Sequence, residues 1–175
     1  MTQTRGIDFT SLTLQDALDL AILIEEEARD RYEEFADQME LHHTPEAAHF
    51  FRIMSKNEEK HRTELASRRT ALFKDAPGAV TRTMIFDIEA PDYDEARAFM
   101  TARQALTAAL RSEEKAHAFF TAALPRVTDP DVKRLFEELR EEEVEHRRMV
   151  EEQIARQPDD PPFKADDFAD DPVAQ

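Results

Sequence analysis

Several residue types are scarce or missing in this chain of 175 residues, and their absence excludes whole classes of protein. There is no cysteine, which excludes disulfides, zinc fingers, iron–sulfur clusters and cysteine-ligated mononuclear iron sites. Only 2 glycines are present, which argues against a turn-rich β sandwich and against a glycine-rich phosphate-binding loop. No apolar run approaches the roughly 18–20 residues that a membrane-spanning helix needs.

Charge, in contrast, is abundant and mostly negative. The chain has 39 Asp and Glu against 23 Lys and Arg, for a formal net charge of −16. This excess argues against a nucleic-acid partner and against binding to anionic membrane surfaces. The N-terminal residues also lack the apolar core of a signal peptide. We therefore expect a cytoplasmic protein with neither nucleic acid nor membrane as a partner.

Apolar residues recur with helical spacing in four stretches that are rich in Ala, Glu, Leu and Arg. The spacing predicts four long helices, at about residues 13–39, 45–73, 92–124 and 131–156. The third helix is expected to begin at Asp92 or Tyr93, directly after Pro91. Short turns join the first two helices and the last two, so each pair should be an antiparallel hairpin.

A longer connection, residues 74–91, separates the two hairpins. Two hairpins joined by a long crossover are typical of a ferritin-like bundle, so the predicted fold is an all-α, ferritin-like four-helix bundle. We expect residues 1–157 to form this domain. Residues 158–175 are acidic and rich in Pro, and we expect them to be a disordered or surface-lying tail.

Polar residues interrupt the apolar face of each predicted helix near its middle. Each helix has one Glu there, and the second and fourth helices add a His three residues later, which gives Glu25, Glu58, His61, Glu113, Glu143 and His146. The second hairpin repeats the first in this respect. Burying an unpartnered carboxylate costs several kcal/mol, so divalent cations are the natural compensation. Carboxylates and imidazoles without thiolates suit iron or manganese and do not exclude zinc.

The Glu-x-x-His pattern alone is weak evidence, because it also occurs away from the apolar faces. Glu46/His49 and Glu114/His117 lie off the apolar faces, and we interpret them as solvated helix surfaces. The alternative for the main six is a set of surface ion pairs, which requires six polar residues to occupy core positions by accident. Tyr32 lies on the apolar face of the first helix. It is either a hydrogen-bonding partner or redox relay near the site, or a plain core residue.

These motifs resemble those of the rubrerythrin family within the ferritin-like superfamily. Residues 25–32 read E-x-x-A-R-D-R-Y, similar to the family's E-x-x-A-R-N-R-Y, and the resemblance extends over about residues 12–156. It implies that two iron ions are bound by Glu25, Glu58, His61, Glu113, Glu143 and His146. Glu58 and Glu143 would be the bridging pair, and manganese or zinc could replace iron in a given preparation.

The sequence departs from typical rubrerythrins in two respects. Typical members carry a rubredoxin domain whose Cys residues deliver electrons, whereas this chain has no Cys. The resemblance therefore implies an external reductant, either a separate electron-donor protein or a small molecule. Ala116 stands where typical members have a further Glu that lets one iron shift its ligation. The remaining four Glu and two His look more like the ferroxidase centre of bacterioferritin.

Three functions remain open at this point. The first is a di-iron oxidoreductase that reduces H2O2 or O2 with an external electron donor, and with no catalytic side chain beyond the metal ligands. The second is a ferroxidase or iron-binding protein of iron homeostasis. The third is a metal-stabilised structural bundle without turnover. The long crossover and the acidic tail favour a homodimer or a small homo-oligomer.

Overall fold

The structure is a computed structural model, and it describes residues 7–85, 88, 90–91 and 100–159. Its long helices are α1 (Leu14–Leu41), α2 (Pro45–Phe73), α4 (Ala102–Ala123) and α5 (Pro130–Arg156). They pair as α1 with α2 and α4 with α5, so the predicted all-α bundle of two hairpins is confirmed. Within the described ranges, no helix combines the length and apolarity that crossing a bilayer requires.

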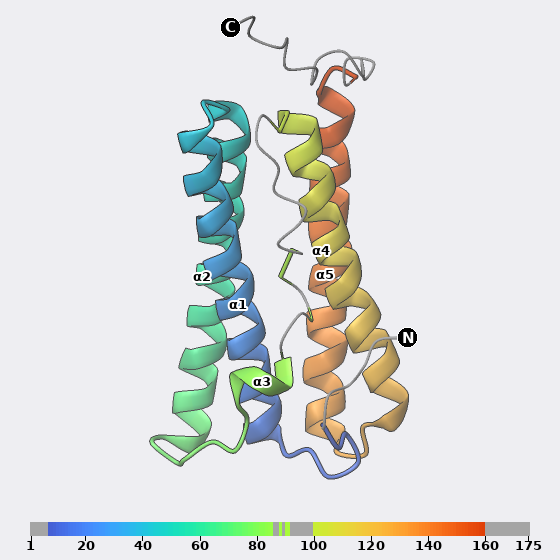
Figure 1. The fold of residues 1–175 in the computed structure, drawn as a ribbon. Coiled ribbons are helices and arrows are strands. Elements are labelled where there is room, and N and C mark those ends of the chain that lie inside the picture. Colours follow the sequence, from blue (N-terminus) through green and yellow to red (C-terminus); the bar gives the residue numbers. More distant parts are fainter. Residues whose placement is uncertain (1–6, 86–87, 89, 92–99, 160–175) are drawn as a thin grey trace, which may run out of the picture.

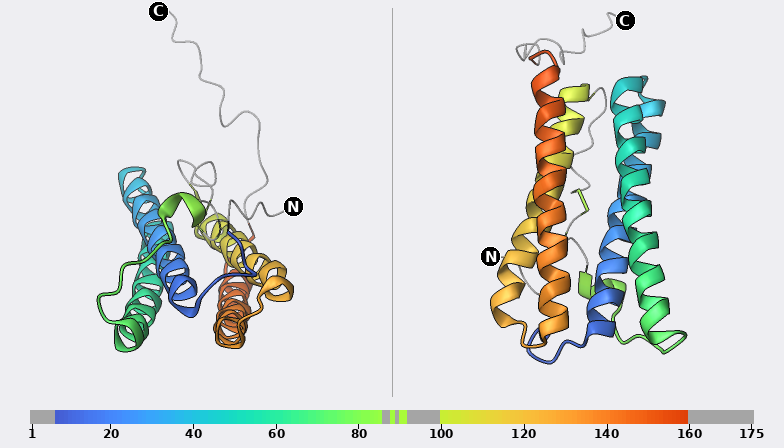
Figure 2. Two further views of the ribbon diagram at one scale, coloured as in Figure 1. Left: turned by 90° about the horizontal axis from the view of Figure 1, so that it is seen from below. Right: turned by 180° about the vertical axis from the view of Figure 1, so that it is seen from behind.

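The two hairpins stand side by side, and the described part of their connection lies on one side of the bundle (Figure 1). A short helix of this connection, α3 (Arg82–Ile85), packs against α1. The opposite side is formed by α2 and α5, which face the viewer in the right-hand view of Figure 2.

The connection is held to the bundle by backbone carbonyls near its end. Arg31 of α1 donates to the carbonyl oxygen of Pro91 at 2.5 Å, and Lys115 of α4 donates to that of Ala90 at 2.9 Å. Ala90 and Pro91 are both buried. These contacts tie α1 and α4 to the same short segment and so fix one hairpin against the other on this side.

The third long helix does not run unbroken through Thr101, as the prediction of residues 92–124 required. Its predicted start, Asp92 or Tyr93, lies outside the described residues. Thr101 has an extended backbone, so α4 begins at Ala102. A capping box explains this start. The Thr101 hydroxyl accepts from the backbone N–H of Gln104, and the Gln104 side chain accepts from the backbone N–H of Thr101, each at 3.1 Å.

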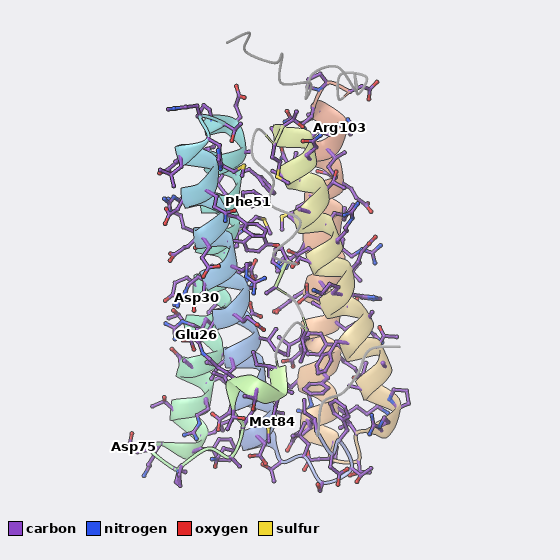
Figure 3. All side chains as sticks on the ribbon, in the orientation of Figure 1. Glu26, Asp30, Phe51, Asp75, Met84 and Arg103 are labelled. Carbon is purple, nitrogen blue, oxygen red and sulfur yellow. The ribbon has the colours of Figure 1, made fainter. Side chains whose placement is uncertain are left out.

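The core consists of two apolar clusters, one toward each end of the bundle. The first cluster is rich in aromatic rings that include Phe119 and Phe136, and the second contains Tyr32 and Phe51. Phe51 lies on the inner side of α2, between the hairpins (Figure 3). The polar residues of the predicted site fall along the helices between these two clusters. Apolar layers therefore close off the site along the bundle axis.

A part of the first cluster was not predicted from the sequence. Phe9, which precedes α1, is fully buried, and its ring centroid lies 5.9 Å from that of Phe119 and 6.3 Å from that of Phe136. The Arg126 guanidinium lies over the Phe9 ring at 4.9 Å. The segment before α1 thus covers the end of the bundle and belongs to the folded domain.

Candidate metal centre

The structure brings the six predicted polar residues together as two groups of the same composition. One group is Glu25, Glu58 and His61, and the other is Glu113, Glu143 and His146. Within each group, one ligand atom from every residue lies within 4.8 Å of the others. All four Glu are buried. The expected alternative, a set of surface ion pairs, does not describe these positions.

In the first group, His61 lies between the carboxylates of its own helix and of α1. Its Nδ1 is 3.7 Å from Oε2 of Glu58 and 3.8 Å from Oε2 of Glu25. Glu58 and His61 are three residues apart on α2, which places them one turn apart on the same face. The pairing of α1 with α2 then adds the third residue. Each part of the group thus follows from helical spacing or from the hairpin.

The second group repeats this arrangement in the other hairpin. His146 Nδ1 is 3.7 Å from Oε2 of Glu143 on its own helix and 3.2 Å from Oε2 of Glu113 on α4. The shorter contact to the carboxylate of the partner helix is the main difference from the first group. The sequence repeat is therefore also a repeat of geometry.

The two groups meet in the middle of the bundle. The His61 and His146 rings are stacked, with centroids 4.8 Å apart and an interplanar angle of 6°. Tyr32 of the first hairpin donates its hydroxyl to Oε1 of Glu113 in the second, at 3.4 Å. Tyr32 is fully buried, so it is both a core residue and a hydrogen-bonding partner of the site. Its counterpart in the repeat, Phe120, has no hydroxyl to donate.

Burial and mutual charge shift the proton affinities in the second group. Burial opposes a charged imidazole at His146, but hydrogen bonds and charge from Glu113 and Glu143 outweigh it and raise the pKa of His146 to about 11. Burial raises the pKa of Glu143 well above the usual carboxyl value, and the charge of Glu113 adds to this rise. Metal ligands bind in their deprotonated form, so a cation bound here displaces these protons.

The donor atoms fit a pair of divalent cations. Both carboxylate oxygens of Glu58 and Oε2 of Glu143 are buried, and they make no hydrogen bond to any residue that the structure describes. Buried polar atoms are nearly always hydrogen-bonded, so such oxygens call for a ligand of another kind. Four carboxylates and two imidazoles provide the charge and the donor types that iron, manganese or zinc accept. The two groups therefore form a candidate di-metal centre.

The remaining Glu-x-x-His pairs are on the surface, as expected. Glu46 and His49 are exposed, and Glu114 is exposed and forms an ion pair with Arg147 at 3.9 Å. His117 is partly buried on the same face. Neither pair joins the groups in the bundle centre, so helix face distinguishes the site better than the motif itself.

Two hollows open on the α2/α5 side of the bundle and reach the candidate centre. The apolar hollow, of about 320 Å³, is lined by Phe50, Ile53, Met149 and Val150 around Glu58 and His146. The acidic hollow, of about 150 Å³, is lined by Glu64, Glu138 and Glu142 around His61. The sequence analysis missed both hollows. Ile53, Met149 and the three Glu lie beside the apolar faces, and only the spacing of α2 and α5 brings them together.

The sequence matches a known protein family, and the fold matches a solved structure. A family model described as Rubrerythrin matches residues 16–98 and 104–162, which include all six residues of the two groups. A crystal structure of an uncharacterized conserved protein from Magnetospirillum magnetotacticum MS-1 is 29% identical, with a TM-score of 0.68. The match covers 87% of this chain and 100% of that chain. No curated protein matches the sequence.

Proposed function

The chain belongs to the rubrerythrin family, and from this premise we propose that it is a di-iron oxidoreductase that reduces H2O2 with electrons from an external donor. One observation carries the proposal. Two buried Glu/Glu/His groups of the same composition meet at the stacked rings of His61 and His146. Two ions of the same kind, held side by side, suit a reaction that transfers two electrons at once.

Each ion has its own set of residues in this proposal. Glu25 and His61 would hold one ion, Glu113 and His146 would hold the other, and Glu58 and Glu143 would be shared between them. Iron at this position would supply the two electrons that reduction of a peroxide requires. The four carboxylates balance the positive charge of the ions in a low-dielectric interior.

The surrounding residues orient the ligands and exclude water. The Tyr32 hydroxyl holds the Glu113 carboxylate in place, which limits the directions in which it can bind an ion. Apolar side chains on both sides of the centre, including Leu139 and Val150 of α5, restrict access along the bundle axis. Because the chain has no Cys, the reducing electrons come from a separate protein or a small molecule.

A second candidate function, ferroxidase activity, is favoured by the acidic hollow. Glu64, Glu138 and Glu142 line this hollow beside His61, and Arg68, which also lines it, pairs with Glu138. The carboxylates still outnumber the one cationic side chain in the lining. A path lined by carboxylates concentrates cations, so Fe(II) can be the substrate instead of a resident cofactor. Ala116 is fully buried where typical rubrerythrins have a further Glu, which also favours this alternative.

Anaerobic protein loaded with two Fe(II) per chain and mixed rapidly with H2O2 or with O2 tests the proposal. We expect H2O2 to oxidise the iron about tenfold faster than O2. A difference of about 1.4 kcal/mol in activation free energy in favour of H2O2 is enough for this ratio of rates. Absorbance of the ferric product follows the reaction. Faster oxidation by O2 with continued uptake of added Fe(II) would establish the ferroxidase alternative. Inertness toward both oxidants would favour a structural bundle.

The hydroxyl of Tyr32 provides a further prediction. We expect Tyr32→Phe to keep the fold, since only one oxygen is removed from a buried ring, and to weaken binding at the Glu113 group by about 10-fold or more. Competition with a metal chelator measures this loss. Phe120→Tyr is not a suitable control because it adds an oxygen to a packed core. Ser55→Ala serves as the control, since it removes a buried hydroxyl that donates to a carboxylate outside the two groups, that of Glu33, at 3.2 Å. Equal affinity in all three proteins would show that the hydrogen bond does not position Glu113.

A further inference from the structure

The apolar hollow on the α2/α5 side is too large and too apolar for the oxidant alone. Its volume is about 320 Å³, whereas one water molecule occupies roughly 30 Å³ of the liquid and H2O2 only about twice as much. Hollows of this size with apolar walls are typical binding sites for small organic molecules. The hollow therefore matches an organic ligand better than a peroxide.

The rim of the hollow carries exposed apolar side chains that are not part of the bundle core. Ile53 of α2 is 43% exposed and Met149 of α5 is 40% exposed, and they line the hollow from opposite sides. Phe50 and Val150 extend the apolar wall inward. These side chains make the hollow an apolar opening between two helices, here called the slot, against whose walls an apolar ring can pack.

The inner wall of the hollow is polar and belongs to the candidate centre. Glu58 and His146 line it, and both oxygens of the fully buried Glu58 make no hydrogen bond to any described residue. The amides of Asn57 and Gln153 are further hydrogen-bonding groups in the lining. When Glu58 and His146 hold an ion, a ligand with hydroxyl groups on its ring can still hydrogen-bond to these two amides while its ring stays in the apolar slot.

Charge restricts the ligand further. Neither Arg nor Lys is among the described residues that line the hollow, whereas Glu58 and Glu152 are. Glu152 forms an ion pair with Arg148, and the Glu58 oxygens make no hydrogen bond to a described residue. With His146 neutral as a metal ligand, the lining offers no cationic side chain, so an anionic ligand is disfavoured. The apolar walls disfavour a hydrated cation. The hollow is suited to an uncharged ring that bears hydroxyl groups.

We propose that the apolar hollow binds a hydroquinone, a small uncharged ring with two hydroxyls, as the electron donor of the proposed peroxidase reaction. This inference rests on the proposed function, which needs an external reductant because the chain lacks Cys. The stoichiometry balances: one hydroquinone loses two electrons and two protons from its O–H bonds and becomes a quinone. The H2O2 accepts the two electrons and two protons, its O–O bond breaks, and two water molecules form.

Binding of hydroquinone itself to the full-length protein loaded with redox-inert Zn(II), under anaerobic conditions, tests the site without any turnover. Ligand-observed NMR gives the dissociation constant. We expect Met149→Trp, which fills the slot, to weaken binding by about tenfold or more, because the displaced ring loses its apolar contacts. Val144→Trp is the matched control, since Val144 is 45% exposed on the same helix and does not line the hollow. It should bind hydroquinone as the wild type does.

The dimethyl ether of hydroquinone separates hydrogen bonding from apolar contact. It keeps the ring but has no hydroxyl to donate, so we expect it to bind about fivefold or more weakly than hydroquinone. No binding of hydroquinone to the wild type, or equal binding by the Met149 and Val144 variants, overturns the proposal. So does sedimentation that shows a dimer lost in Met149→Trp but not in Val144→Trp, because a second chain then covers the hollow.

Failure of the proposed hydroquinone site can be distinguished from failure of the proposed peroxidase function. A single oxidation of iron by H2O2 needs no donor, so it tests the peroxidase proposal in the wild type whether or not hydroquinone binds. If iron is oxidised but hydroquinone does not bind, only the donor site is wrong. If hydroquinone binds but H2O2 does not oxidise the iron, the peroxidase proposal fails and the hollow remains a binding site.

Discussion

Replacing Glu58 and Glu143 together by Ala is expected to slow the oxidation of the Fe(II)-loaded protein by H2O2 by about 100-fold or more. Changes to residues that only orient a metal ligand already cost about 10- to 100-fold, so loss of both proposed bridging ligands should cost more. Bound iron should also fall below two ions per chain. Rapid-mixing kinetics and metal analysis of dialysed protein measure the two effects.

The chain offers a matched control for this double variant. Glu46→Ala with Glu114→Ala removes the same two side chains from Glu-x-x-His motifs whose Glu residues are exposed. It lowers the net negative charge equally, so any effect of overall charge on iron uptake appears in both variants. We expect the control to oxidise iron at the wild-type rate. An equal rate in the two double variants would show that the ligands lie elsewhere.

The location of the candidate centre could be predicted because its residues violate the pattern of the helices that carry them. Glu58 and Glu143 occupy positions at which the periodicity demands apolar side chains, and the burial of both confirms those positions. Helical spacing fixes each Glu relative to the His that follows it. The long crossover then determines which helices lie side by side. Local rules were therefore sufficient to bring the six residues together, although their role as metal ligands stays a prediction.

The start of α4 was mispredicted because two start signals compete in the sequence. Pro91 followed by acidic residues is typical of a helix N-terminus, and so is Thr101 with Gln104 three residues later. The structure shows the second signal in use, with both hydrogen bonds of the capping box formed. Sequence periodicity alone gives no way to rank such signals, because their relative strength depends on tertiary contacts.

The two hollows were not predictable, since they depend on the distance between helices. Ile53 and Met149 stand on different hairpins and lie beside the apolar faces of their helices, where periodicity predicts solvent. Their joint position at one hollow depends on how far α2 and α5 stand apart. That distance results from the packing of both core clusters. Features between elements thus required the structure, whereas features within one helix face did not.

Glu58→Leu should have opposite effects on stability with and without metal. Glu58 is fully buried, and neither of its carboxylate oxygens makes a hydrogen bond to a described residue, so without a metal ion they lack a partner. Leaving such a group unsatisfied costs about 1–3 kcal/mol, so a Leu of similar volume should raise the free energy of unfolding by about that amount. For a chain of this size, each kcal/mol corresponds to a rise in Tm of about 2–4 °C.

With a redox-inert ion such as Zn(II) bound, the wild type should instead be more stable than Glu58→Leu. Binding to the native state alone stabilises the wild type by about 2.7 kcal/mol when free metal is 100 times its Kd. Glu58→Leu lacks a proposed bridging ligand and should gain much less. Thermal unfolding with and without Zn(II) measures both differences, and Glu114→Leu on the exposed face of α4 should shift neither by more than about 0.5 kcal/mol.

The opposite effects of Glu58→Leu on stability with and without Zn(II) distinguish a metal site from a structural polar cluster. If Glu58 stabilised the fold through contacts with His61 and Glu25, its replacement by Leu would destabilise the protein in both conditions. If Glu58 is a metal ligand, its carboxylate lowers the stability of the metal-free protein, and metal binding restores that stability. A lower Tm of metal-free Glu58→Leu would therefore contradict the assignment of Glu58 as a ligand, and a higher Tm that Zn(II) no longer raises would support it.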